Sequence, residues 1–328
     1  QRLAALSIDG VVRIWAVDSG RVLLTLPFAA VDDAMFGLRF SPDGRWLAAN
    51  GRGCKIWDTT TGREHLSLLP GKVAGHVSFS PHSKWIAIPN ATVKVMELAT
   101  GKEVAELNGH FDFVFSSAFS PDGKFLATAG RDQVVKFWDT TWWREQATIK
   151  GHSNSILAIE FAPDGQTLAT ASLDHTVKLW PLTPLLNQPR MTTDGANAVQ
   201  VLHPSKVILQ PLSFAPDGRR LVSATTELQS DGTRKHGVSL RVLDVNTGAE
   251  LLAKQAEESS FRSAIFSADG RQIITGDTSG QIKFHDAATG QLLKTFAGGP
   301  GEIIHLACSR DGRWLATGST EQGVMVWE

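Results

Sequence analysis

The stretch Gly109–Asp139, GHFDFVFSSAFSPDGKFLATAGRDQVVKFWD, decides the fold. In its middle, Ser-Pro-Asp-Gly separates two short apolar runs. Pro fixes φ, Asp tolerates the third position and Gly closes the turn, which is typical of a type I turn. The runs on both sides predict two short strands that this turn joins into a hairpin. Apolar and basic residues then alternate over Val134–Trp138, which predicts a third, half-buried strand.

The same pattern recurs along the whole chain. The strand that ends at Trp138 has counterparts that end at Trp15, Trp57, Met96, Trp180, Leu243, His285 and Trp327, typically 42 residues apart (positions 15 and 57, for example). Versions of the turn precede most of them, at Phe40–Gly44, Phe79–Ser83, Phe119–Gly123, Phe161–Gly165, Phe214–Gly218, Phe266–Gly270 and Cys308–Gly312. A steady period of this length predicts an all-β repeat protein with about four short strands in each repeat.

Four short strands per repeat resembles the WD40 repeat, and the resemblance covers essentially all of the chain. It implies a β-propeller of four-stranded antiparallel blades. It also implies a buried hydrogen-bonded tetrad in two adjacent repeats, formed by His110, Thr128, Asp132 and Trp138 and by His152, Thr170, Asp174 and Trp180. The other repeats lack part of this set, so we expect apolar packing to hold their blades together.

The number of blades depends on the two end segments. Three strands are predicted within Arg2–Leu26 and three within Ile303–Trp327, with six complete repeats between them. In a seven-bladed ring, Arg21–Leu26 completes the final blade; an eight-bladed ring needs one further strand at each end. We favour seven blades over eight, because the loss of an inner strand exposes core. Residues 1–328 are then one propeller domain, and the start at Gln1 indicates a fragment of a longer chain.

Composition argues against several classes of partner. Lys and Arg total 32 and Asp and Glu total 33, so the net charge of −1 disfavours a general nucleic-acid-binding surface. No apolar run approaches the roughly 20 residues that span a bilayer. The two cysteines, Cys54 and Cys308, cannot form a disulfide scaffold, and free thiols are favoured over a single bridge. We expect a cytoplasmic protein that binds neither nucleic acid nor membranes.

The sequence contains no strong signature of catalysis. The ten histidines show no His-x-x-x-His or Glu-x-x-His pairing of the kind that metal sites need, and no Gly-x-Ser-x-Gly motif is present. His285 stands at a repeat position that carries Trp elsewhere, which favours a structural substitute over a ligand. The recurring aspartates are explained by the turns. We therefore expect no enzyme activity, no cofactor and no metal.

Two insertions break the period between Trp180 and Leu243, and the first of them predicts a binding surface. It lies at about 181–195, in the connection from the third to the fourth strand, and carries apolar residues. The preceding repeat has two tryptophans at the same connection. We expect a docking patch on one face of the propeller, made by Trp142, Trp143, Arg144, Leu185, Leu186, Pro189 and Met191. The alternative is that the loop covers both tryptophans as a satellite hydrophobic cluster, and both interpretations stay open.

The second insertion, at about 225–237, is polar, and we expect a loop there rather than an extension of a hairpin. It opens on the opposite face, where a second candidate site is predicted at Phe111, Phe113 and Arg131. Aromatic and Arg side chains are the residues on which interaction hot spots rely. At least one of the two Phe rings is expected to pack beneath its loop.

Taken together, these features predict a non-catalytic scaffold. Its loop faces are expected to bind other proteins or peptides, or other domains of the same chain. The alternative is a sensor or regulatory WD40 domain of a larger protein whose kinase or NTPase domain lies elsewhere. Fold alone does not separate the two, because many functions share one fold.

Overall fold

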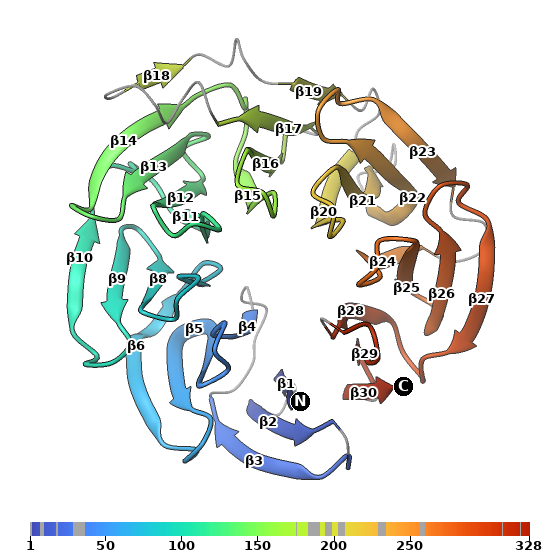
Figure 1. Ribbon diagram of the computed structural model, residues 1–328, viewed down its shortest axis with the longest axis horizontal. Helices are drawn as coiled ribbons and strands as arrows, with labels where there is room; N and C mark the ends of the chain where they lie inside the picture. The colour runs from blue at the N-terminus through green and yellow to red at the C-terminus, as the bar shows by residue number, and fades with distance from the viewer. Residues whose placement is uncertain are drawn as a thin grey trace. The chain divides into compact units, whose positions relative to one another are not determined.

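The computed structural model describes residues 2–6, 10–17, 19–28, 37–174, 176–182, 191–193, 199–202, 207–228, 234–255, 260–309, 311–321 and 323–328. Within these ranges the chain forms strands and turns without any helix, as Figure 1 shows. The described part therefore contains no helix that could cross a membrane. Two compact units are present, residues 1–161 with 181–197, and residues 162–180 with 198–328.

The strands of the first unit are β1 (Arg2–Leu6), β2 (Val11–Ala16), β3 (Val22–Pro27), β4 (Gly37–Phe40), β5 (Trp46–Asp58), β6 (Glu64–Val73), β7 (Ser78–Phe79), β8 (Trp85–Pro89), β9 (Val93–Glu97), β10 (Glu103–Leu107), β11 (Val114–Phe119), β12 (Phe125–Gly130), β13 (Val135–Asp139), β14 (Arg144–Ile149), β15 (Ile156–Phe161) and β18 (Met191–Thr193).

The strands of the second unit are β16 (Thr167–Ser172), β17 (Thr176–Pro181), β19 (Val199–Leu202), β20 (Val207–Phe214), β21 (Arg220–Leu228), β22 (Arg234–Asp244), β23 (Glu250–Gln255), β24 (Phe261–Phe266), β25 (Gln272–Asp277), β26 (Gln281–Asp286), β27 (Leu292–Ala297), β28 (Ile303–Cys308), β29 (Leu315–Ser319) and β30 (Gly323–Trp327).

These strands form eight sheets, and in each sheet the strands lie in chain order. The orders are β1-β2-β3, β4-β5-β6, β7-β8-β9-β10, β11-β12-β13-β14-β18, β15-β16-β17-β19, β20-β21-β22-β23, β24-β25-β26-β27 and β28-β29-β30. The 13-residue β5 covers two strand positions, because Trp46 corresponds in the repeat to Phe125 of β12 and Trp57 to Trp138 of β13. The repeat of four antiparallel strands is therefore confirmed.

The expectation of seven blades is wrong. It required the strand that follows residue 21 to complete the last sheet of the chain. That strand, β3, instead pairs antiparallel with β2, for example Val12 with Leu26, and belongs to the first sheet. A short connection holds β2 and β3 side by side as a hairpin, so local closure decides the pairing. The result is eight blades, of which the first and the last have three strands in the described residues.

The turns that join the first two strands of each sheet follow from their sequence. In the turn before β12, the Gly123 N–H donates to the Ser120 carbonyl over 2.8 Å, and Gly123 has a φ of 73°. Asp122 accepts hydrogen bonds from the Ser120 hydroxyl and the Lys124 N–H. Only glycine adopts this left-handed conformation at little cost, so the Asp-Gly pair fixes the hairpin.

Apolar side chains on facing sheets form the core. One cluster joins Val95 of β9, Leu107 of β10, Phe119 of β11, Leu126 of β12 and Trp138 of β13, each of them buried. The alternation along each strand directs one set of side chains toward the preceding sheet and the other set toward the following one. Neighbouring sheets within a unit therefore stabilise each other.

A polar network lies inside one of these interfaces. The Nδ1 atom of His110 lies 2.7 Å from Asp132 Oδ2, and its Nε2 atom lies 2.8 Å from the Thr128 hydroxyl oxygen. The Trp138 indole N–H donates to the same hydroxyl over 2.8 Å. Nδ1 carries the proton in this network, because Asp132 can only accept; the Thr128 hydroxyl then donates to Nε2. All four residues of the first expected tetrad are thus hydrogen-bonded to one another.

Other repeats share contacts of this network. Trp180 donates to Thr170 over 2.9 Å, and Trp327 donates to Thr317 over 3.1 Å. His285, which replaces Trp in β26, is buried, and its Nε2 lies 3.2 Å from the Thr275 hydroxyl. Its imidazole therefore takes the position and the partner of an indole, as expected for a structural substitute.

Replacing Thr128 by Val tests the network. The variant keeps the volume of the side chain but leaves the Trp138 indole N–H and His110 Nε2 without their partner in a buried site. Each unpaired buried group costs about 1 to 3 kcal/mol, so we expect a loss of roughly 2 to 4 kcal/mol in the free energy of unfolding, measured by urea titration.

Thr317→Val in β29 is the matched control, because Thr317 accepts one indole hydrogen bond from a half-buried Trp327. A loss of only about 1 kcal/mol is expected there. Equal losses in the two variants would show that the His110 network adds nothing.

Candidate functional site

Trp142 and Trp143 lie in the turn between β13 and β14. The Asp139 carboxylate accepts hydrogen bonds from the N–H groups of Thr141 and Trp142, each over 2.9 Å. The N–H of Trp143 donates to the Asp139 carbonyl over 2.8 Å. Asp58, Asp244 and Asp286 hold the equivalent turns of other sheets in the same way. The aspartate therefore fixes the backbone of the turn that carries the two indoles.

Trp143 occupies a position that is glycine in the equivalent turns. Its φ is 54°, close to the values of Gly62, Gly101, Gly248 and Gly290, which lie between 69° and 72°. A left-handed conformation costs a residue with a Cβ roughly 1 to 2 kcal/mol. Packing of the Trp143 ring offsets this cost.

The Trp143 ring packs between the first strand of its own sheet and the preceding sheet. Its centroid lies 5.1 Å from that of Trp85 on β8, edge to face, and 6.5 Å from that of Phe119 on β11. The Lys84 ammonium lies over the Trp85 ring at 4.6 Å. Trp143 is half-buried and packs against the core cluster of these sheets. Its indole is part of the interface between sheets, while residues 183–190 of the insertion that could cover the tryptophans lie outside the described residues.

Trp142 points to solvent instead, with 73% of its surface exposed, and the neighbouring Arg144 is exposed as well. The expected partners Leu185, Leu186 and Pro189 lie outside the described residues. Met191 begins β18, which pairs in parallel with β14, Met191 opposite Ala147. Of the expected patch, Trp142 and Arg144 are therefore the two side chains that the structure shows exposed.

The second candidate site lies in the loop that leads into β11. Phe111 exposes 82% of its surface, and its N–H lies 3.4 Å from Asp132 Oδ2, the carboxylate bound to His110. The half-buried Phe113 packs on Phe115, with centroids 5.1 Å apart. The buried network thus anchors the backbone of this loop, which carries one packed ring and one free ring.

Arg131 completes this loop surface. Its N–H donates to the Phe113 carbonyl over 2.8 Å, and its guanidinium lies 4.0 Å from the Asp112 carboxylate. Both side chains are largely exposed, so the ion pair contributes little to stability. The charged groups remain available beside Phe111.

The insertion at about 225–237 is an extended hairpin rather than the expected loop. β21 and β22 continue pairing through Glu227 with Lys235 and Leu228 with Arg234. Polar composition hid these strands, because the segment lacks the apolar alternation that predicts a strand.

The two cysteines are free. Burial raises the pKa of Cys54 to about 12 and that of Cys308 to about 11. Both thiols are therefore protonated at neutral pH and poor nucleophiles. Among the residues that the structure describes, no three His, Cys, Asp or Glu side chains lie together as metal ligands would.

Glu160 on β15 has a strongly shifted pKa. Burial raises the pKa of its carboxyl group from 4.5 to about 7, and the charge of Arg39 on β4 lowers it in part. Between these two values the unfolded chain ionises Glu160 while the folded protein keeps the proton. Stability attributable to this group therefore falls as the pH rises from 4.5 to 7.

Glu160→Gln should remove this dependence. We expect wild-type protein to lose about 1 to 3 kcal/mol more than the variant between pH 4.5 and pH 8, measured by urea unfolding at both values. The lower part of this range allows for the solvent that reaches a half-buried residue. An equal loss in the two proteins would contradict the shifted pKa.

Separate substitution of the two tryptophans tests their different environments. Trp142→Ala should change the free energy of unfolding by less than about 0.5 kcal/mol. Trp143→Ala should cost about 1 to 3 kcal/mol, because it empties the space beside Trp85. Trp143→Gly should be about 1 kcal/mol more stable than Trp143→Ala, since glycine accepts the positive φ. Equal stability of the Ala variants would contradict the packing described.

Comparison with known families and proteins shows repeats of one kind. The family model described as WD domain, G-beta repeat matches residues 23–58, 101–139, 143–181 and 290–328. Eukaryotic translation initiation factor 3 subunit I of Lodderomyces elongisporus is 34% identical over 95 residues, 26% of either chain. WD repeat-containing protein SL1-17 of Schistosoma mansoni is 32% identical over 140 residues, 42% of this chain and 46% of that one. The matches span less than half the length of these relatives.

A solved structure shares the fold. The crystal structure of the computationally designed Ika8 protein matches with a TM-score of 0.78 at 20% identity, over 99% of this chain and 92% of that chain. At this identity the likeness concerns the fold alone. It shows the expected fold class, an all-β propeller built from four-stranded antiparallel blades.

Proposed function

Because this chain is a WD40-repeat protein with a β-propeller fold, we propose that it is a non-catalytic scaffold that binds other proteins through loop-borne aromatic residues. The observation that carries the proposal is Phe111, whose ring is 82% exposed on a backbone anchored to a buried hydrogen-bond network. A large apolar side chain held in water by an ordered loop is typical of a binding site.

The ordered loop that carries Phe111 lowers the conformational entropy that binding would cost. Asp132 holds the Phe111 N–H, and the Arg131 N–H is bound to the Phe113 carbonyl, so little backbone freedom is lost when a partner docks. Burial of a Phe ring removes about 150 to 250 Å² from water, which contributes a few kcal/mol. The Arg131 and Asp112 charges beside the ring favour a partner that offers a polar rim around an apolar contact.

Trp142 supports a second contact on a different turn. It is exposed while its neighbour Trp143 is packed, so the Trp142 side chain can be buried by a partner without disturbing the sheet. We also infer that the partners are met in a reducing compartment such as the cytoplasm, which the two free cysteines support.

Single substitutions test the proposal. Phe111→Ser and Trp142→Ser remove one exposed ring each, and we expect each variant to lose at least tenfold in partner recovery when tagged protein is used for quantitative affinity capture. Stability should be unchanged within about 0.5 kcal/mol, because neither ring is packed.

Leu251→Ser on β23 is the matched control, since Leu251 is a half-exposed apolar residue outside both turns. Partners recovered equally with wild type and the two aromatic variants, or lost equally with the Leu251 control, would overturn the proposal.

A further inference from the structure

The sequence contains two Asn-Gly pairs, Asn50 with Gly51 and Asn108 with Gly109. An asparagine before glycine can deamidate without an enzyme, because glycine has no side chain to keep its backbone nitrogen away from the neighbouring amide carbon. The reaction also needs a backbone that is free to turn toward that carbon, since an extended strand holds the two atoms apart. The environment of each pair therefore decides whether it reacts.

The pair at Asn50 is protected by its strand. Asn50 and Gly51 are both buried inside β5. Asn50 pairs with Gly37 on β4, and the Gly51 carbonyl accepts a hydrogen bond from the Ala74 N–H over 2.8 Å. This pairing keeps the backbone extended, and only 1% of the surface of Asn50 is exposed to the water that the reaction consumes. We expect this pair to be stable.

The pair at Asn108 is in a different environment. Asn108 and Gly109 are exposed, and they lie outside the strands that the structure describes, directly after β10 ends at Leu107. The Asn108 amide group donates to the Glu106 carbonyl over 3.3 Å, in an exposed position where such a bond contributes little. Water reaches this amide and the backbone of the pair is not held in a sheet, so both conditions for deamidation are met.

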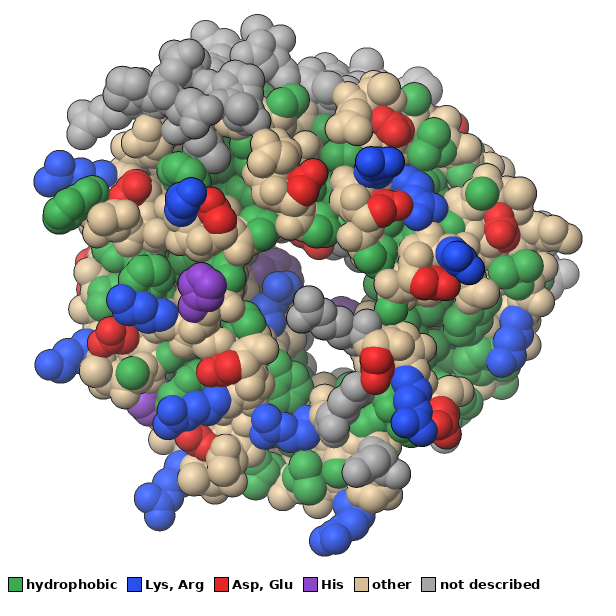
Figure 2. All heavy atoms as spheres, viewed as in Figure 1, with side chains coloured by type: hydrophobic (Ala, Val, Ile, Leu, Met, Phe, Trp, Pro, Cys, Tyr) green, Lys and Arg blue, Asp and Glu red, His purple; other side chains and the backbone are tan. Residues whose placement is uncertain are grey.

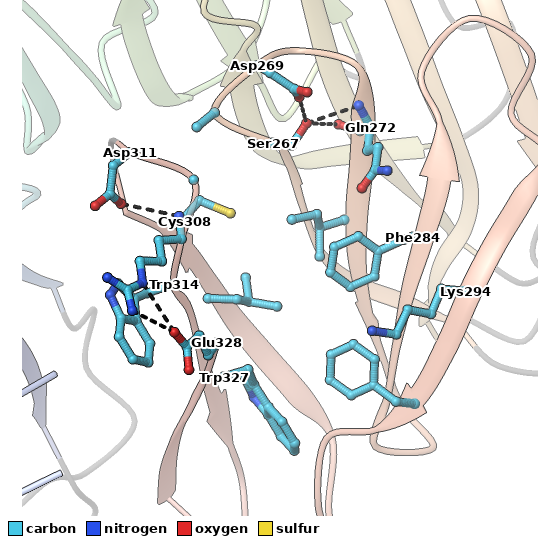
Figure 3. A pocket seen from close by; sticks show the side chains of 16 residues that line it. Ser267, Asp269, Gln272, Phe284, Lys294, Cys308, Asp311, Trp314, Trp327 and Glu328 are labelled. Atoms are coloured by element: carbon cyan, nitrogen blue, oxygen red, sulfur yellow. Dashed lines mark hydrogen bonds and ion pairs between the residues drawn. The ribbon is translucent and has the colours of Figure 1, made fainter. Parts of the chain in front are cut away.

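Asp-Gly pairs form the same cyclic product when the carboxyl group is protonated, but the hairpin turns restrain them. The Gly270 N–H donates to the Ser267 carbonyl over 2.9 Å, so the attacking nitrogen is engaged. The Ser267 hydroxyl donates to the Asp269 carboxylate over 2.6 Å, as Figure 3 shows, and this bond lowers the pKa of Asp269. Acidic side chains lie beside basic ones in Figure 2, which also favours the ionised form. An ionised carboxyl group reacts poorly, so Asn108 differs from these turns.

Asn108 and Gly109 join two parts of the chain that are held firmly. On one side, Leu107 is buried in the core cluster. On the other side, the His110 ring belongs to the buried hydrogen-bonded tetrad. Gly109 itself lies close to the Trp138 ring of that tetrad, because a Cβ at this position would be 3.1 Å from it. A longer backbone between Leu107 and His110 must therefore displace one of these contacts.

We propose that Asn108 is a modification site that converts spontaneously to isoaspartate and thereby loosens the tetrad. The Gly109 nitrogen attacks Asn108 Cγ; a C–N bond forms, the nitrogen loses its proton, and Nδ2 leaves as ammonia. Water then opens the cyclic imide at either of its carbonyl carbons. Attack at Cγ gives aspartate. Attack at the backbone carbonyl carbon gives isoaspartate, in which the main chain runs through the side chain and is longer by one methylene, about 1.5 Å.

The longer backbone acts on the loop that carries Phe111. It moves His110 away from Asp132, and the Phe111 N–H, which lies 3.4 Å from the same carboxylate, loses its anchor. The stability of the protein then declines with its age. Binding at Phe111 declines as well, a consequence that rests on the proposed function, whereas the modification and the loss of stability do not.

Incubation of the folded protein at about pH 8 and about 37 °C tests the modification. Peptide mapping by mass spectrometry should show that Asn108 converts at least tenfold faster than Asn50. In protein unfolded by guanidinium chloride the two pairs should convert at similar rates, because β5 no longer protects Asn50. Conversion during digestion affects both pairs alike, so Asn50 is the internal control. An unchanged Asn108 in the folded protein, or equal conversion of the two pairs there, would overturn the proposal.

Two variants separate the modification from its effect. Asn108→Gln forms the corresponding ring far more slowly, so it should keep its urea midpoint over an incubation in which the midpoint of wild type falls. Freshly prepared Asn108→Asp carries the new charge on a backbone of normal length, and its midpoint should equal that of fresh wild type. In aged wild type alone, the NMR signal of the His110 Nδ1 proton should weaken.

Two results would contradict the loosening of the tetrad. The first is wild-type protein that contains isoaspartate at position 108 with an unchanged midpoint and an unchanged His110 signal. The second is an equal loss of stability in fresh Asn108→Asp, which would assign the effect to charge rather than to backbone length. All of these measurements use the protein without a partner, so their failure is distinct from a failure of Phe111 to bind one.

Discussion

A sheet of four short strands has two apolar faces and too few residues to bury either of them alone. This constraint governs repeat proteins of this kind, because a sheet depends on a neighbouring repeat to cover its apolar face. Trp138 shows the dependence directly: the strand β13 carries it, yet its ring packs among side chains of β9 and β10. Contacts between repeats therefore stabilise the protein as much as contacts within them do. The loss of a strand destabilises the neighbouring sheets as well as its own.

The same constraint separates what was predictable from what was not. Turns and strands follow from local chemistry, so the Ser-Pro-Asp-Gly hairpins and the ends of β28 and β30 agree with the expectation. The His110 network was expected from the resemblance to the WD40 repeat, whose tetrad residues two repeats of this chain carry at the same spacing. The number of blades was not, because the period says how many strands exist and not which edge each one joins. β3 could only be assigned to β2 from its pairing.

The two tryptophans show why a candidate site needs the folded neighbour. Adjacent in sequence and alike in chemistry, they differ because Trp85 and Phe119 meet one ring and nothing described covers the other. No property of residues 140–144 alone encodes that difference.

The turn before the outer strand carries glycine where the residue that it faces on the preceding outer strand is large. A Cβ on Gly62 would lie 2.9 Å from Leu24 of the preceding outer strand, and one on Gly290 would lie 2.8 Å from Leu252. Where the turn carries Trp143, the corresponding residue of the preceding strand is Ala105, which packs against the same cluster. At this interface the turn carries the large side chain and the preceding strand carries the small one, the reverse of the arrangement at Gly62 and Gly290. The repeats are therefore not interchangeable units, because the residue in each turn must fit the residue that it faces on the preceding outer strand. In an array with the repeats in another order, Trp143 would face a leucine.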